Sequence, residues 1–159
     1  MTKIPTSTRS VRIEEAQAPE DVAAVRQLFR DYALWLNVDL HFQDFDGEMA
    51  RFPKGYDRIL LARADGAPAG AVGLRSLAPG ICEMKRLYVP DRFRGLGLGR
   101  ALCVRLLDEA RGLGYRAMRL DTLDRLTEAL SLYRSLGFAV CPAYYDNPLE
   151  GVVYLEKAL

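Results

Sequence analysis

Three glycines alternate with leucines between two arginines in the segment RGLGLGR, residues 94–100. Glycine lets backbone N–H groups approach a ligand without an intervening Cβ. Apolar residues at helical spacing follow over residues 98–113, so these amides would lie at a helix start, where unpaired N–H groups and the helix dipole attract anions. Together with the charges of Arg92, Arg94 and Arg100, the segment predicts a phosphate-binding loop, and a pyrophosphate is the expected ligand.

Other phosphate loops fit this segment less well. A P-loop requires lysine and a hydroxyl residue after its last glycine, but Arg100 and Ala101 stand there. A dinucleotide fold requires GxGxxG directly after a strand, with an acid about 20 residues on. Asp121 satisfies the distance, but the spacing is GxGxG and five residues follow Val89 before the loop begins. A tight glycine turn without a ligand is the remaining alternative.

Length and composition are those of one ordinary globular domain. The chain has 159 residues, half of them hydrophobic, and a net charge of +1. This balance predicts neither a nucleic-acid nor a membrane partner, and no apolar run reaches about 18 residues. Residues 1–10 are expected to be a flexible tail and residues 11–159 a single domain. The protein is expected to be cytoplasmic and to be a monomer or homodimer.

Cysteine and histidine usage argues against a metal site. Cys82, Cys103 and Cys141 are odd in number and widely spaced, which favours reduced thiols over a disulfide or a metal site. His41 is the only histidine, so no histidine-based zinc site is expected.

Hydrophobic periodicity predicts a mixed α/β (α+β) sheet in the order βα(α)βββαβαββ. Alternating or apolar runs indicate strands, a DG pair between two of them indicates a hairpin turn, and Asp124 is a candidate N-cap for the last helix. The expected strands cover 11–17, 58–66, 68–77, 81–89, 117–122, 138–145 and 151–158, and the expected helices cover 19–35, part of 37–52, 98–113 and 124–136.

Three motifs in this order resemble the GNAT superfamily of coenzyme A-dependent N-acyltransferases. RGLGLG fits the superfamily's R-x-x-G-x-G loop, EMKRLYVP (83–90) is similar to its central strand, and YRSLGF (133–138) is similar to its Y-x-x-x-G-F motif. The resemblance extends from about residue 11 to the end. It implies a GNAT-like single domain with a splayed central strand pair, and acetyl-CoA as co-substrate without a metal.

The resemblance also implies how acetyl-CoA is bound. Backbone groups of Leu87 and Val89 would bond the pantetheine arm, and the amides from Gly95 to Arg100 would surround the pyrophosphate. Many members carry an asparagine where this chain has Leu126, so one polar contact is missing. The expected binding residues are Leu87, Tyr88, Val89, Arg94, Gly95, Leu96, Gly97, Leu98, Gly99, Arg100, Ala129 and Tyr133.

Catalytic roles follow from the same resemblance. The Leu87 N–H would polarise the thioester carbonyl, Tyr133 would protonate the departing thiolate, and Glu83 would deprotonate the acceptor amine, directly or through water. Period-2 alternation would place Glu83, Lys85 and Leu87 on one face of the strand. The alternatives are a core position for Tyr133 and a structural Glu83–Lys85 ion pair.

An acidic and aromatic segment over residues 31–50 lacks lysine and arginine. Acids attract protonated amines and aromatic faces hold cations, so the segment is a candidate wall for a small cationic or amino-acid-like acceptor. An amphipathic segment with aromatics packed on the sheet is the alternative. The candidate acceptor residues are Tyr32, Trp35, Phe42, Asp44 and Phe45.

The function that follows is N-acetyl transfer from acetyl-CoA to a primary amine of a small molecule or peptide. A domain that binds acyl-CoA without catalysis would keep the glycine loop but would not need Glu83 and Tyr133. An NAD-binding domain is a more distant alternative. A binding measurement that finds coenzyme A, NAD or neither would distinguish these three hypotheses.

Overall fold

The computed structural model describes residues 10–159, which form a seven-stranded sheet with helices on both faces. The strand order along the sheet is β1-β2-β3-β4-β5-β7-β6, and only β4 and β5 run parallel. The mixed α/β class and the predicted element order are therefore confirmed. The strands are β1 (Val11–Glu15), β2 (Arg58–Ala64), β3 (Ala67–Ala78), β4 (Ile81–Tyr88), β5 (Ala117–Leu123), β6 (Ala139–Val140) and β7 (Val152–Ala158).

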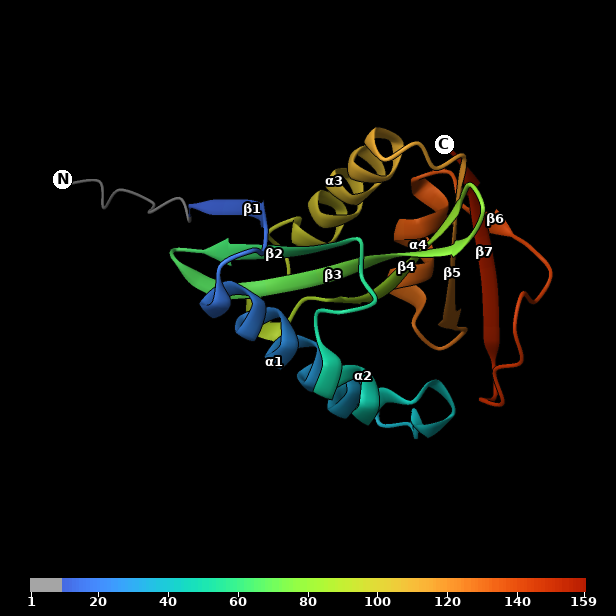
Figure 1. Cartoon of the computed structure of the whole chain (residues 1–159), viewed down its shortest axis with the longest axis horizontal. Helices are drawn as coiled ribbons and strands as arrows, with labels where there is room; N and C mark the ends of the chain where they lie inside the picture. The colour runs from blue at the N-terminus through green and yellow to red at the C-terminus, as the bar shows by residue number, and fades with distance from the viewer. Residues whose placement is uncertain (1–9) are drawn as a thin grey trace, which may run out of the picture.

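Two helical layers cover the sheet (Figure 1). Helices α3 and α4 lie over one face, and α1 and α2 lie over the other. The apolar stripe of each helix packs on the sheet, as amphipathic periodicity requires. The helices are α1 (Pro19–Leu36), α2 (Phe45–Arg51), α3 (Leu98–Gly112) and α4 (Thr127–Ser135), with short 3₁₀ turns η1 (His41–Gln43) and η2 (Asp91–Phe93).

The sheet is split along the boundary between β4 and β5. Parallel pairing joins only Ile81–Glu83 to Ala117–Arg119, although both strands continue well beyond these residues. From Met84 onward, β4 has no strand partner on this edge among the described residues. Its backbone groups there are open to a ligand, since an unpaired strand edge keeps its hydrogen-bonding capacity.

A β-bulge at Arg86 changes which face each β4 side chain occupies. Arg86 has a left-handed backbone (φ 59°), and the register with β3 shifts by one residue at this point. Leu87 consequently packs against the α3 face, together with Met84. Tyr88 packs against the α1 face. The expectation that Leu87 shares a face with Glu83 and Lys85 is therefore wrong, because simple alternation cannot account for a bulge.

The remaining differences concern element ends. The DG turn is a two-residue hairpin with φ positive at Asp65 and Gly66, as predicted. Asp124 does not cap α4, whose N-cap is Leu126.

The strand predicted over 138–145 is also wrong for most of its length, because only Ala139–Val140 pairs. Pro142 cannot donate to a ladder, and the next tyrosines turn toward the sheet split. Residues 1–9 of the predicted tail lie outside the described residues. Ser10 already bonds Asp65 at the hairpin.

Candidate active site

A cavity of about 480 Å³ opens where β4 and β5 separate. It extends from the glycine turn before α3 to the start of α4. Twelve of the residues predicted for acetyl-CoA or the acceptor line it: Tyr32, Trp35, Leu87, Tyr88, Val89, Arg94, Gly95, Gly97, Leu98, Gly99, Ala129 and Tyr133.

The glycine turn forms an open backbone surface at one end of this cavity. Gly95 and Gly97 have left-handed backbones (φ 86° and 74°), which glycine adopts without strain. A Cβ built on either residue would meet nothing within 4 Å, so the space above the turn is open to a ligand. Gly97 is also the N-cap of α3, and no side chain caps the helix. The first amides of α3 therefore keep their capacity to bind an anion.

The arginines around the turn are held in different ways. Arg94 donates to the Val89 carbonyl (3.1 Å), pairs with Asp91 (3.1 Å) and stacks over the Trp35 ring at 5.0 Å. Arg100 instead bonds Ser135 at the end of α4 (2.6 Å) and does not line the cavity. Leu96 is the other predicted acetyl-CoA-binding residue that does not line the cavity, and it is exposed. Of these side chains, Arg94 is the one positioned to meet an anion.

Tyr133 lies on the cavity wall at the other end, on the inner face of α4. Only 7% of it is exposed, and its ring meets Phe138 edge-on at 5.9 Å. Burial raises the pKa of its phenol well above the ordinary value, so the hydroxyl stays protonated at neutral pH. No hydrogen bond of this hydroxyl is formed within residues 10–159, and Tyr133 is one of the residues that line the cavity.

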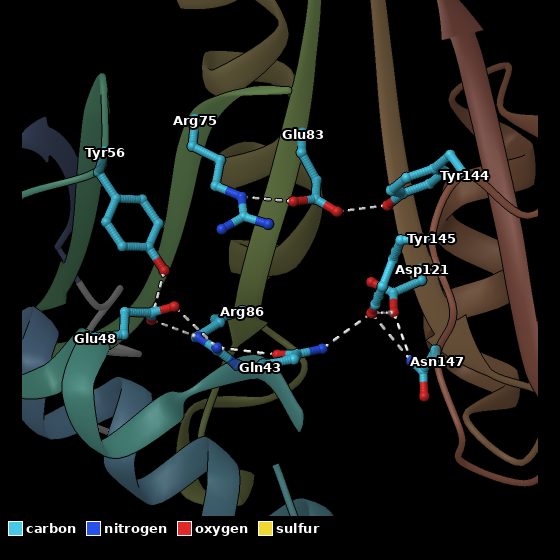
Figure 2. Close-up of polar contacts among 10 residues, drawn as sticks. All are labelled: Gln43, Glu48, Tyr56, Arg75, Glu83, Arg86, Asp121, Tyr144, Tyr145 and Asn147. Atoms are coloured by element: carbon cyan, nitrogen blue, oxygen red, sulfur yellow. Dashed lines mark hydrogen bonds and ion pairs between the residues drawn. The ribbon is translucent and has the colours of Figure 1, made fainter. Parts of the chain in front are cut away.

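Glu83 is fully buried in β4, below the point where the strands separate. Its carboxylate accepts hydrogen bonds from Arg75 Nε (2.7 Å) and the Tyr144 hydroxyl (2.5 Å), as Figure 2 shows. It pairs with Arg75 rather than with Lys85, so the ion pair considered as the alternative to a catalytic role is not formed. Glu83 does not line the cavity, and contact with a ligand there would require a bridging water molecule.

Arg86 is the charged residue that sequence reasoning missed. The bulge directs it toward α2, where Glu48 accepts from its Nε (2.9 Å) and Nη2 (3.1 Å), and Gln43 accepts from Nη2 (3.0 Å). The guanidinium also lies over the Phe45 ring at 4.9 Å. Burial alone would lower the pKa of Arg86, but the hydrogen bonds and charge of Glu48 outweigh it and raise this pKa.

A second polar chain continues from Gln43 across the split (Figure 2). Gln43 donates to the Tyr145 hydroxyl (3.0 Å), which itself donates to Asp121 Oδ2. Asn147 donates to the same Asp121 oxygen (2.8 Å). The loop before β7 is thereby connected to β5 and to η1. From the sequence, Asp121 is only a candidate nucleotide-binding acid. In the structure it lies on the wall of the cavity.

Three of the predicted acceptor residues do not reach the cavity. Asp44 pairs with Arg51 at the surface (3.3 Å), and Phe42 packs under α1. The Phe45 ring packs against the Arg86 guanidinium. The backbone changes direction after α1, because Asn37 and Asp44 both have left-handed backbones. Tyr32 and Trp35 alone of the five line the cavity, since they lie on α1 itself, whose C-cap is Asn37.

The structure also bears on metals and membranes. No group of three or more histidine, cysteine or acidic side chains within residues 10–159 is arranged to hold a metal ion. In the same range, no helix is long and apolar enough to span a bilayer.

The fold, with its split between β4 and β5, is that of known acetyltransferase structures. Residues 22–138 match the model of the acetyltransferase (GNAT) family, so the chain belongs to that family. An uncharacterized N-acetyltransferase of Schizosaccharomyces pombe is 38% identical, covering 92% of this chain and 94% of its own.

Solved structures have the same fold. An acetyltransferase from Streptococcus agalactiae superposes with a TM-score of 0.76 at 18% identity, covering 94% of this chain and 98% of its own. The Salmonella typhimurium protein yncA, whose structure contains acetyl-CoA, superposes with a TM-score of 0.69 at 24% identity over 93% of both chains.

Proposed function

We propose that this enzyme transfers the acetyl group of acetyl-CoA to a primary amine. The observation that carries the proposal is the continuous cavity that joins the glycine turn, the unpaired edge of β4 and the Tyr133 hydroxyl. An anion site, a strand edge and a proton donor along one cavity match the successive parts of acetyl-CoA: pyrophosphate, pantetheine amides and thioester.

The turn and the strand edge fit this co-substrate. An open space above Gly95 and Gly97 accommodates a pyrophosphate, which the first amides of α3 and Arg94 would bind. The unpaired edge of β4 beyond the bulge offers backbone groups of Leu87 and Val89 to the pantetheine amides. Since Arg94 bonds the Val89 carbonyl, pantetheine would compete for that oxygen.

The chemistry assigned to the chain is a direct transfer. The neutral acceptor nitrogen attacks the thioester carbonyl, so a C–N bond forms and the C–S bond breaks. The Leu87 N–H stabilises the developing charge on oxygen. The nitrogen's proton passes through a water molecule to Glu83, and the Tyr133 hydroxyl gives its proton to the departing thiolate and regains one from solvent.

Ligand titration and turnover test the proposal together. Acetyl-CoA should bind in calorimetry and NAD should not, and thiol release should rise when a panel of amines is added. Binding without thiol release for any amine would favour a non-catalytic acyl-CoA module. Binding of NAD in place of acetyl-CoA would overturn the assignment of the cavity.

The role of Glu83 has its own test. Glu83→Gln should lower kcat by about 100-fold or more, most strongly at low pH, where deprotonation of the amine limits the rate. Glu156→Gln is a matched control, since Glu156 on β7 pairs with Arg119 on β5 (2.6 Å) and neither residue lines the cavity. A folded Glu83→Gln enzyme with an unchanged pH profile would make Glu83 purely structural.

A further inference from the structure

A buried lysine without a partner lies beside the proposed acetyl-transfer site. Lys85 on β4 is only 4% exposed, and no residue in the described part of the chain bonds or ion-pairs with it. Burial lowers the pKa of Lys85, and this effect is opposed mainly by the charge of Glu83. An unpaired charge in a protein interior is costly, so its presence calls for an explanation.

Lys85 faces a small second cavity of about 40 Å³ on the α1 side of the sheet. This volume matches roughly a carboxylate group, given that one water requires about 10–15 Å³ by this measure. The small cavity adjoins the large one, because both are lined by the same residues at the split: Tyr32, Met84, Arg86, Asp121, Thr122 and Leu126. A ligand could therefore occupy both cavities at once.

The charges in the small cavity favour an anion. Two cations, Lys85 and Arg86, line it, against one acid, Asp121. Arg86 uses Nε and Nη2 for Glu48 and Gln43 and is not paired with Asp121. Asp121 Oδ2 is already occupied by Tyr145 and Asn147. The Lys85 ammonium is thus left without an acceptor at the small cavity, next to the positive charge of Arg86.

We propose that Lys85 and Arg86 bind the carboxylate of the acceptor, so that the substrate is an amino acid with its amine and carboxylate close together. This inference rests on the proposed function and names its substrate class. The carboxylate enters the small cavity, which holds the amine at the boundary with the large one. Asp121 lies at that boundary, and because its Oδ2 already accepts from Tyr145 and Asn147, Oδ1 is the oxygen left to accept a hydrogen bond from the amine.

Matched acceptor pairs test the inference. Each common amino acid is compared with its carboxamide, which keeps the amine and side chain but lacks the negative charge. For the preferred amino acid, kcat/KM should exceed that of the amide by about 10- to 100-fold, the value of a hydrogen bond to a charged group. Lys85→Met should remove most of this preference through KM, while the affinity for acetyl-CoA stays unchanged.

Stability provides a readout independent of turnover. Methionine has a similar length and no charge, so Lys85→Met should keep or raise Tm, whereas removal of a structural lysine would lower it. The exposed Lys54→Met is the matched control and should change neither acceptor preference nor Tm. A Lys85→Met enzyme that still prefers acids over amides would overturn the inference.

Binding measurements separate this inference from the proposed function. Amino acids and amides are titrated into the enzyme saturated with coenzyme A. Binding of acids but not amides supports the carboxylate site even if no acetyl transfer occurs, in which case the proposed function fails alone. Turnover of amides at the same rate as acids, or binding of neither member of any pair, would overturn the carboxylate site alone.

Discussion

The Tyr133 hydroxyl is the group whose contacts best separate a catalytic role from a packing role. Its ring packs against Phe138 in the core, which is the ordinary reason for a tyrosine on an apolar helix face. The hydroxyl itself forms no hydrogen bond in the described range, and Tyr133 lines the cavity. Packing therefore explains the ring, while the proposed catalytic role rests on the hydroxyl.

Tyr133→Phe should lower kcat by about 100-fold or more with little change in acetyl-CoA affinity, because the ring remains and only the proton donor is lost. Steady-state kinetics and calorimetry check this expectation. Tyr115→Phe is the control, since that hydroxyl bonds Asp57 away from the cavity. If Tyr133→Phe and Tyr115→Phe turned over equally fast, the hydroxyl of Tyr133 would have no role in the reaction.

At the scale of elements, the glycine turn and α3 form one anion-binding unit. Gly99 is the position to test, because its backbone is not left-handed and an added Cβ would meet only Leu132 at 3.5 Å. A valine there is compatible with the fold yet projects beside the first helix amides. Substitution of Gly95 or Gly97 would add backbone strain and confuse the result.

Gly99→Val should weaken acetyl-CoA binding at least about 10-fold in calorimetry while Tm changes little, because the side chain hinders approach of the pyrophosphate. The matched control is Gly112→Val at the other end of the same helix, where an added Cβ meets nothing within 4 Å. Equal affinities for the two variants would remove the turn from the binding site.

Helix α2 is connected to the bulge of β4 by the buried Glu48–Arg86 pair. Glu48→Gln leaves the guanidinium without its counter-charge, so the free energy of unfolding should fall by about 3 kcal/mol. Urea denaturation measures the loss. Asp108→Asn, which breaks an exposed pair with Arg111 (3.3 Å), should cost less than about 1 kcal/mol. If Glu48→Gln lowered the free energy of unfolding no more than Asp108→Asn does, the Glu48–Arg86 pair would not stabilise the position of α2.

The same pair makes stability depend on pH. Burial alone would raise the pKa of Glu48, but the hydrogen bond and charge of Arg86 outweigh it and lower this pKa. The stabilisation is therefore complete above about pH 4.3, the ordinary glutamate value, and is lost as the pH falls through the lower folded-state pKa. Denaturation curves at decreasing pH should fall more steeply for wild type than for Glu48→Gln. Parallel curves would contradict this assignment.

At the scale of the whole molecule, the split joins elements from most of the chain. The cavity takes walls from α1, β4, the glycine turn, β5 and α4. The loop before β7 is linked to both sides of the split through Tyr144 and Tyr145, which bond Glu83 on β4 and Asp121 on β5. A ligand that fills the split would bridge both halves of the sheet, so binding should stabilise the fold as one unit.

Saturating acetyl-CoA should raise Tm by about 5–10 °C when it is present at 100 times its Kd, since ligand binding then adds about 2.7 kcal/mol to stability. Differential scanning calorimetry measures the shift. NAD at the same concentration should leave Tm unchanged. A Tm unaffected by acetyl-CoA at concentrations up to the millimolar range would argue against the split as its binding site.

The sequence by itself determined the order of the helices and strands and the glycine turn, although not every element end, because periodicity, turn residues and glycines act over a few neighbouring positions. It also placed Tyr133 on the inner face of α4. Only the tertiary structure decided where the β4 side chains point, since the bulge at Arg86 depends on pairing with β3. It likewise brought Lys85, Arg86 and Asp121 to one split from strands that no local pattern connects. Such contacts depend on side chains far apart in the chain, for which a single sequence carries no periodic signal.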